Sequence, residues 1–166
     1  MAGSNPRNRA SRSSASEPPA DAETAVWQRA LRLLAARERS VAELATRLRD
    51  AGGTNEAVDA VLERLRARGY LDDRRVAEHA AQQAVRRGRG SLYARAQLAA
   101  RGVAPPLIDT AIGAHFTDEA TLAGTVLARR YASPPQSVAD RARAARFLLQ
   151  RGFPRAVVLA ILNEGC

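Results

Sequence analysis

The chain combines 166 residues with a net charge of +9; 46% of its residues are apolar and only 4% are aromatic. A core of this composition consists mostly of Ala, Leu and Val, which favours helices, while the positive field favours a polyanion or an acidic protein as partner. The single cysteine, Cys166, excludes an intramolecular disulfide bond, and no apolar run is long enough to span a membrane.

Residues 1–23 are rich in Ser, Pro, Asn and Arg and show no apolar periodicity, which predicts a disordered tail. A transit peptide is the alternative interpretation, and it is disfavoured because Asn and Pro residues interrupt the amphipathic helix that it would need. The three arginines of this segment are balanced by three carboxylates. The whole excess of positive charge therefore belongs to residues 24–166.

The first predicted unit, residues 24–71, contains three apolar stripes at helical spacing. The first stripe begins at Trp27, the second follows Ser40, and the third follows Asn55. Ser40 and Glu43 form a capping-box pattern, in which each side chain bonds to the backbone N–H of the other residue. This segment is therefore predicted to fold as three helices.

The segment from Gly69 to Asp73, GYLDD, separates this unit from the next. Gly69 stops the preceding helix, and the apolar Tyr70 and Leu71 are expected to be buried between two units. Asp72 and Asp73 are expected to start the next helix, and either can be its N-cap. We predict that these five residues form a structural joint.

Two further units, residues 72–116 and 117–166, are also predicted to be helical throughout. Their expected helices cover 76–87, 91–101 and 105–116, and then 118–131, 138–151 and 154–163. Pro105 and Pro106 suit the first turn of a helix, where a missing N–H is not needed. No segment alternates strictly between apolar and polar residues, so the predicted fold class is all-α.

A period of 50 residues relates the three units. The sequences LRDAG, LAARG and LLQRG end at Gly52, Gly102 and Gly152. Apolar residues share this offset, as listed here: Leu48, Leu98 and Leu148; Val58, Ile108 and Val158; Leu62, Ile112 and Leu162. Such a period indicates tandem copies of one supersecondary unit, here three helix-turn-helix-like repeats of three helices each. Counted over residues 24–75, 76–116 and 117–166, each unit carries a charge of +3.

The sequence GYLDDRRVA, residues 69–77, resembles the joint between the first two units of the RecX family of recombination regulators. RRGRGSLYARAQLAARGVAPPLIDTAI is similar to the second unit of that family, and ARRYA and RFLLQRGF are similar to its third. The resemblance covers about residues 26–164. The chain departs from the family pattern at Val76, where a large aromatic residue is usual, and at Gln97, where Glu is frequent.

The resemblance implies an elongated, curved array that acts as a regulator and not as an enzyme. Proteins of this family bind RecA along the groove of the RecA–single-stranded-DNA filament, limit filament growth, and inhibit RecA ATP hydrolysis, strand exchange and coprotease activity in recombination, DNA repair and the SOS response. A cytoplasmic monomer with weak, sequence-independent DNA binding is expected. The residues alone support the repeats and the distributed charge, and they do not identify RecA.

Arginines are the candidate contacts with a protein partner or with nucleic acid. They are Arg64 and Arg68 in unit one, Arg86, Arg87 and Arg89 in unit two, and Arg141, Arg143 and Arg146 in unit three. Solvation and favourable positions at helix C-termini account for about half of them. The aromatic residues do not interleave with these arginines in a stacking pattern; Tyr93 and Tyr131 could stack on bases, although packing is the favoured role.

Other chemistry has little support in the sequence. His79 and His115 are the only histidines and do not show metal-ligand spacing. We therefore expect no catalytic residue, no metal site and no cofactor.

Two other functions remain open. A helix-turn-helix transcriptional regulator would use the two helices between Ser40 and Gly69, although no helix has a compact set of residues suited to base edges. A helical scaffold for an acidic protein is the third interpretation.

Overall fold

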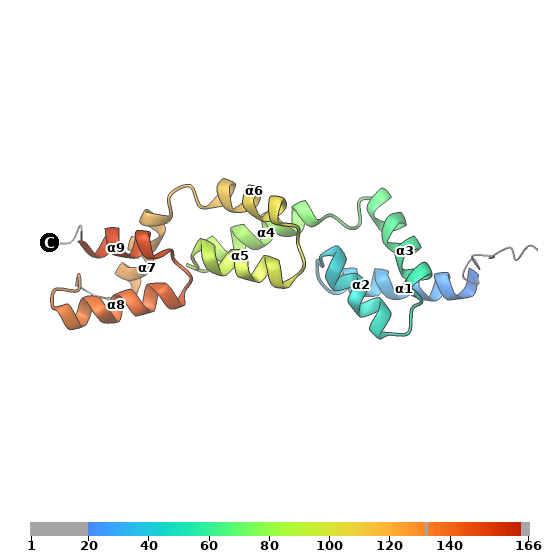
Figure 1. The fold of residues 1–166 in the computed structure, drawn as a ribbon, viewed down its shortest axis with the longest axis horizontal. Coiled ribbons are helices and arrows are strands. Elements are labelled where there is room, and N and C mark those ends of the chain that lie inside the picture. The colour runs from blue at the N-terminus through green and yellow to red at the C-terminus, as the bar shows by residue number, and fades with distance from the viewer. Residues whose placement is uncertain (1–19, 132, 164–166) are drawn as a thin grey trace, which may run out of the picture.

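The computed structural model describes residues 20–131 and 133–163, and α-helices are the only regular secondary structure in this part of the chain (Figure 1). Their bounds are α1 Ala20–Ala36, α2 Val41–Asp50, α3 Asn55–Ala67, α4 Asp73–Arg86, α5 Ser91–Ala100, α6 Pro105–His115, α7 Glu119–Arg130, α8 Val138–Gln150 and α9 Arg155–Asn163. The predicted all-α class is confirmed.

Three separate apolar cores hold these helices together. The first is formed by α1–α3, the second by α4–α6 and the third by α7–α9. Leu, Val, Ile and Ala make up almost all of the buried side chains, and Phe153 is the large exception in the third core. Figure 1 shows the three groups following one another along the long axis, so the molecule is an elongated helical array.

Local hydrogen bonds set the ends of the helices. The predicted capping box is present at α2, where the Glu43 N–H donates to Ser40 Oγ (3.1 Å) and the Ser40 N–H donates to the Glu43 carboxylate (3.0 Å). The repeat glycines Gly52, Gly102 and Gly152 have φ angles of 89°, 72° and 81°. This left-handed conformation, which favours glycine, closes helices α2, α5 and α8 at equivalent points.

Helix α1 begins earlier than the sequence indicated. It starts at Ala20, so residues 20–23 are helical, and the prediction of disorder is wrong for them. Asp21 and Glu23 lie in the first turn, where carboxylates interact favourably with the positive end of the helix. The rest of the predicted tail, residues 1–19, lies outside the described residues, as does Cys166.

The joint residues Tyr70 and Leu71 have opposite environments. Leu71 is 4% exposed and packs in the first core, as expected, whereas Tyr70 is 53% exposed, so its predicted burial is wrong. The Gly69 N–H donates to Arg66 O and the Tyr70 N–H donates to Leu65 O (3.0 Å), which together form a Schellman motif. This turn leaves Tyr70 on the surface and returns the next residue to the core.

Replacement of Leu71 by alanine tests the role of this turn. Leu71→Ala should lower the free energy of unfolding by about 2–5 kcal/mol, because it leaves a cavity in the first core. Urea unfolding followed by circular dichroism measures the change. Tyr70→Ala and Arg74→Ala, at exposed neighbouring positions, should change stability by less than about 0.5 kcal/mol. Equal effects of Leu71→Ala and Tyr70→Ala would contradict the burial of Leu71.

Candidate interface surface and the joints between repeats

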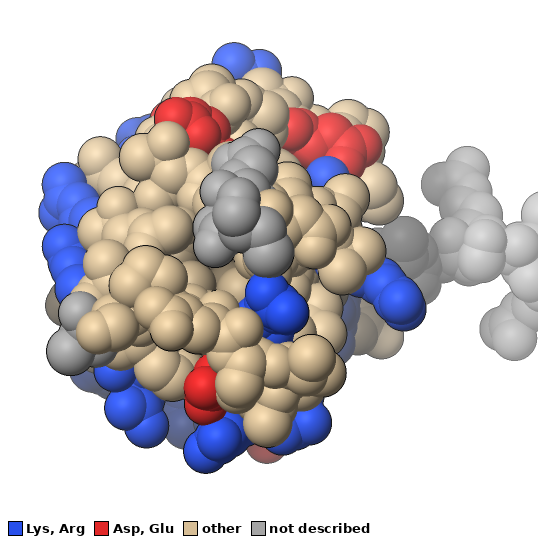
Figure 2. Space-filling view, turned by 90° about the vertical axis from the view of Figure 1, so that its left-hand side faces the viewer, with Lys and Arg blue, Asp and Glu red and all other residues tan. Residues whose placement is uncertain are grey.

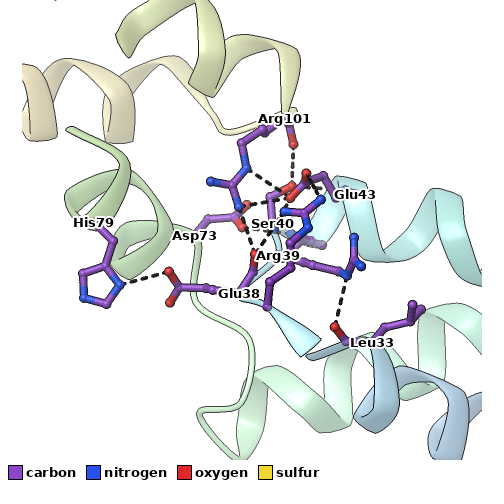
Figure 3. Close-up of polar contacts among 10 residues, drawn as sticks. Leu33, Glu38, Arg39, Ser40, Glu43, Asp73, His79 and Arg101 are labelled. Carbon is purple, nitrogen blue, oxygen red and sulfur yellow. Dashed lines mark hydrogen bonds and ion pairs between the residues drawn. The ribbon is translucent and has the colours of Figure 1, made fainter. Parts of the chain in front are cut away.

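The start of α2 meets the end of α5 at the first joint (Figure 3). Ser40 Oγ donates a hydrogen bond to the carbonyl of Arg101, and the Val41 N–H donates to the Asp73 carboxylate (2.9 Å). The first N–H groups of a helix have no acceptor within the helix. Asp73 supplies one from the start of α4 and so links the first two units. Asp72, and not Asp73, is the N-cap of α4, and its Oδ1 accepts from the Arg74 N–H (2.9 Å).

An arginine bridges the same joint. Arg101 Nε donates to the Glu43 carboxylate (3.1 Å), and another guanidinium nitrogen donates to Glu38 O (3.2 Å). Burial raises the pKa of Glu43, but hydrogen bonds from Ser40 and Arg37 and the charge of Arg101 lower it more, so the net pKa lies below its ordinary value. Glu43 is therefore held in its ionised form at the centre of the joint.

The Glu38 side chain makes a second set of contacts with α4. Its carboxylate accepts from Arg75 Nε (2.8 Å) and lies 3.0 Å from His79 Nδ1. The His79 side chain is 63% exposed, which agrees with its expected position on a solvated helix face. Among the described residues, no group of three His, Cys, Asp or Glu side chains could hold a metal ion.

The second joint repeats the first one about 50 residues further on. The Gly90 N–H donates to Arg151 O (2.9 Å) and the Leu92 N–H donates to Gly152 O (3.0 Å), so the start of α5 meets the end of α8. A side chain at Gly90 would overlap the backbone of Gly152 and Phe153. The middle helices of the three units are thus joined end to end.

The acid and the arginine of the first joint have counterparts in the second. The Ser91 N–H donates to the Glu119 carboxylate at the start of α7 (2.6 Å), as Val41 does to Asp73. Arg151 donates to Gly88 O (3.1 Å), as Arg101 does to Glu38 O. The sequence contains a signal for this role, because Arg precedes Gly at 101 and 151, whereas Ala51 stands at the corresponding position of unit one. The end of α2 meets no other unit among the described residues. Arg101 and Arg151 were not among the contact residues predicted from the sequence.

The start of α8, at the far end of the array, has a local cap like that of α2 but meets no other described unit. Helix α8 has its own cap, because Ser137 Oγ accepts from the Asp140 N–H (3.0 Å) and donates to the Asp140 carboxylate (2.6 Å). The adjacent Val138 is 77% exposed. No later unit of the described chain covers the start of this helix.

The predicted contact arginines of unit one lie on an aromatic ring. The guanidinium carbon of Arg64 is 4.3 Å from the centre of the Trp27 ring, and that of Arg68 is 5.2 Å from it. Arg64 also pairs with Glu23 at 3.4 Å. Both arginines are exposed, and they form one site with Trp27.

Arginine–aromatic contacts recur in the other units. Arg89 lies 4.8 Å from the Tyr93 ring centre and Arg130 lies 5.5 Å from that of Tyr131. The expectation that arginines and aromatic residues do not form a stacking pattern is therefore wrong: Arg89 and Tyr93 lie one helical turn apart, Arg130 and Tyr131 are neighbours, and the guanidinium plane stacks well on rings. One face of each tyrosine is covered by an arginine.

The remaining predicted arginines are distributed over two units. Arg86, Arg87 and Arg146 are exposed, and their side chains make no ion pair with other described residues. Arg143 pairs with Asp140 (2.9 Å), and Arg141 is half-buried. Figure 2, viewed towards the α7–α9 end, shows basic side chains along the left and lower edges. The eight arginines are therefore spread over all three units and do not form one compact site.

Comparison with known proteins identifies the family. A regulatory protein RecX of Chromohalobacter salexigens is 37% identical over 124 residues, which are 75% of this chain and 82% of that protein. The family models for the first and second three-helix domains of RecX match residues 27–65 and 72–112. The chain belongs to the RecX family. It is thus a member of a family of regulatory proteins, and the resemblance in the sequence is confirmed.

Other RecX proteins support the same assignment. The regulatory protein RecX of Leptothrix cholodnii is 38% identical over 136 residues, 81% of this chain and 85% of that protein. The crystal structure of RecX from Lactobacillus salivarius matches with a TM-score of 0.78 at 19% identity, and it covers 88% of this chain and 97% of that one. This likeness shows that the fold is shared along nearly the whole array.

The ionised Glu43 predicts how the stability of the first joint depends on pH. Because its pKa is lowered on folding, its contribution to stability is present above its ordinary value of 4.5 and is lost as the pH falls through the lower, folded value. The difference in unfolding free energy between the native chain and Glu43→Gln should therefore be largest near neutral pH and shrink in acid. Urea titrations between pH 7 and pH 3 measure it. Asp109→Asn, in an exposed pair with Arg95, should change stability by at most about 1 kcal/mol; a pH-independent difference for Glu43→Gln would contradict this role.

Close approach at the second joint gives a further prediction. Gly90→Ala should destabilise the protein by about 1–3 kcal/mol, because the methyl group of the introduced alanine would push the start of α5 away from the end of α8. Gly113→Ala is the matched control: it lies inside α6 with open space around it, so it should be neutral or stabilising by up to about 1 kcal/mol. Thermal unfolding of both variants decides between a real steric limit and a general effect of replacing glycine.

Proposed function

We propose that this RecX-family protein regulates RecA by binding along the RecA–single-stranded-DNA filament. In this proposal it limits filament growth and inhibits RecA ATP hydrolysis, strand exchange and coprotease activity during recombination, DNA repair and the SOS response. The observation that carries the proposal is that the same kind of joint occurs twice, between units one and two and between units two and three, in a chain of this family. A rod of three similar units can contact neighbouring subunits of a helical filament.

The distribution of charge supports this kind of partner. Each unit contributes +3 to the net charge, and the candidate arginines occur in all three units. Exposed arginines without an acidic partner, such as Arg86, Arg87 and Arg146, are the best candidates for phosphates or for acidic side chains of RecA. Binding to DNA alone should be weak, independent of sequence and sensitive to salt.

The remaining parts of the proposal concern how the protein acts. It works by binding, without a catalytic residue or a cofactor, and as a monomer. It acts in the cytoplasm, where RecA assembles on DNA. The part of the chain that the structure describes contains no helix long and apolar enough to cross a membrane.

A helix-turn-helix transcriptional regulator is the second candidate. In that case α3 would be the helix that enters the major groove of DNA. Its exposed side chains include Glu56, Asp59 and Glu63, which would approach the phosphates with the wrong charge. The surface of α3 mixes these acids with the exposed Arg64 and Arg66 and has no compact set of side chains suited to base edges, which disfavours a sequence-specific repressor.

A RecA ATPase titration tests the proposal. The purified protein should slow single-stranded-DNA-dependent ATP hydrolysis by RecA at a low molar ratio to RecA. Bovine serum albumin at the same concentration is the control for non-specific effects. If hydrolysis is unchanged over the whole titration, the proposed function is wrong. If the protein also binds one duplex sequence more tightly than others by several kcal/mol, the repressor is the better interpretation.

A further inference from the structure

A hollow beside the first joint contains four arginines. It has a volume of 340 Å³ and lies between α2 and the end of α5. Arg37, Arg39, Arg47 and Arg101 line it, together with small side chains such as Ala42 and Ala99. We call it the joint hollow. None of these four arginines was among the contacts predicted from the sequence.

The positive charge of the joint hollow is not balanced by the acid that lines it. Glu43 is the one carboxylate in its wall, and this residue is already engaged by Arg37 (2.9 Å) and by Arg101 (3.1 Å). Arg39 uses only its Nε, which donates to Leu33 O (3.2 Å), and leaves its terminal amino groups available. The Arg47 side chain makes no hydrogen bond or ion pair within the described chain.

The surroundings of Arg39 give independent support for an unbalanced positive field. Burial lowers the pKa of Arg39, and the charges of Arg37, Arg47 and Arg101 lower it further, against the single opposing effect of Glu43. Arginine remains charged under these conditions. Arg39 therefore lies in a net positive field, which an anion in the joint hollow would offset.

The basic surface continues past the joint hollow. Arg47 also lines a neighbouring hollow of 190 Å³ in which Arg29 and Leu33 of α1 take part. Asp50 is the acid of that second hollow. Arg47 therefore lines two neighbouring hollows, each with more arginines than acids, which suits an anion with repeated charges better than a single small ion.

We propose that the joint hollow binds a phosphate of a nucleic-acid backbone, with Arg39 and Arg47 as the direct contacts and Arg29 near the next phosphate. A phosphate can accept hydrogen bonds from several arginines at once. A protein partner would need apolar anchors at the centre of its interface, and none of the exposed large apolar residues lines this hollow. The phosphate site is argued from the hollow itself, and this inference rests on the proposed function only for the process in which the site acts.

The second joint reproduces this site only in part, because Arg87, Arg89 and Arg151 correspond to Arg37, Arg39 and Arg101 but the fourth arginine is missing. Adding 50 to each residue number replaces Arg47 by Gln97, Ala42 by Leu92 and Ala99 by Leu149. Both leucines are exposed, at 50% and 45%. The combination of Arg47 with small side chains is therefore specific to the joint between units one and two.

DNA binding by charge-removing variants tests the site. Binding of a fluorescein-labelled oligo(dT) strand is measured by anisotropy over a range of salt concentrations for the native chain, Arg47→Gln, and the double variant Arg39→Gln/Arg47→Gln. For single strands, each lost phosphate contact should make the salt slope shallower by about 0.7, so the double variant should lose about 1.4 in slope and roughly 25-fold in affinity near 0.1 M salt. Arg47→Gln should show about half of the slope change, and because its side chain has no partner it should fold normally.

The double variant Arg129→Gln/Arg155→Gln removes the same charge from exposed positions in unit three and should retain the native slope. An equal loss in this control, an unchanged slope in the Arg39/Arg47 variant, or no binding of oligo(dT) by the native chain would each overturn the site. If the Arg39/Arg47 variant binds DNA normally but no longer inhibits RecA, the hollow binds an acidic protein surface instead. If DNA binding changes as expected while the native chain leaves RecA hydrolysis unaffected, the site stands and the proposed function is wrong.

Discussion

The architecture depends on hydrogen bonds that satisfy the first N–H groups of a middle helix from outside its own unit. In both joints the next unit supplies a carboxylate from its first helix to such an N–H group. Carbonyl groups at the end of its middle helix accept from N–H groups in the second joint and from the Ser40 hydroxyl in the first. Arg101 and Arg151 then hold the two abutting ends together. Since each unit has a small separate core, these polar contacts, more than apolar burial, determine how the units are oriented relative to one another.

The sequence was sufficient for the helices and for the repeat, because both follow from local rules. Apolar periodicity, the capping box at Ser40 and the helix stops at the repeat glycines each depend on residues that are only a few positions apart in the sequence. The position of Tyr70 could not be found in this way, since its apolar character suggested burial and only the geometry of the turn after Gly69 places it outside. Helix α1 was missed at its start because its first turn is stabilised by charge and not by an apolar stripe.

The site was harder to predict than the fold because it is formed by residues distant in sequence. Arg101 lies 58 residues from Glu43, and its guanidinium has a structural role that composition alone does not distinguish from a solvated charge. The contacts of Arg64 and Arg68 with Trp27 likewise depend on how α1 packs against α3. Membership of the RecX family indicates a regulatory role. The joints explain how a chain with few aromatic core residues can form an extended surface for that role.

The alanine at the end of α2 has a consequence for growth of the rod. A repeating end-to-end joint is a heterologous contact, and such contacts can in principle continue from one copy to another and form open fibres. The end of α2 has Ala51 where both joints use an arginine. An end-to-end contact made by this end of the rod with another copy would therefore lack the guanidinium that bridges each joint within the chain.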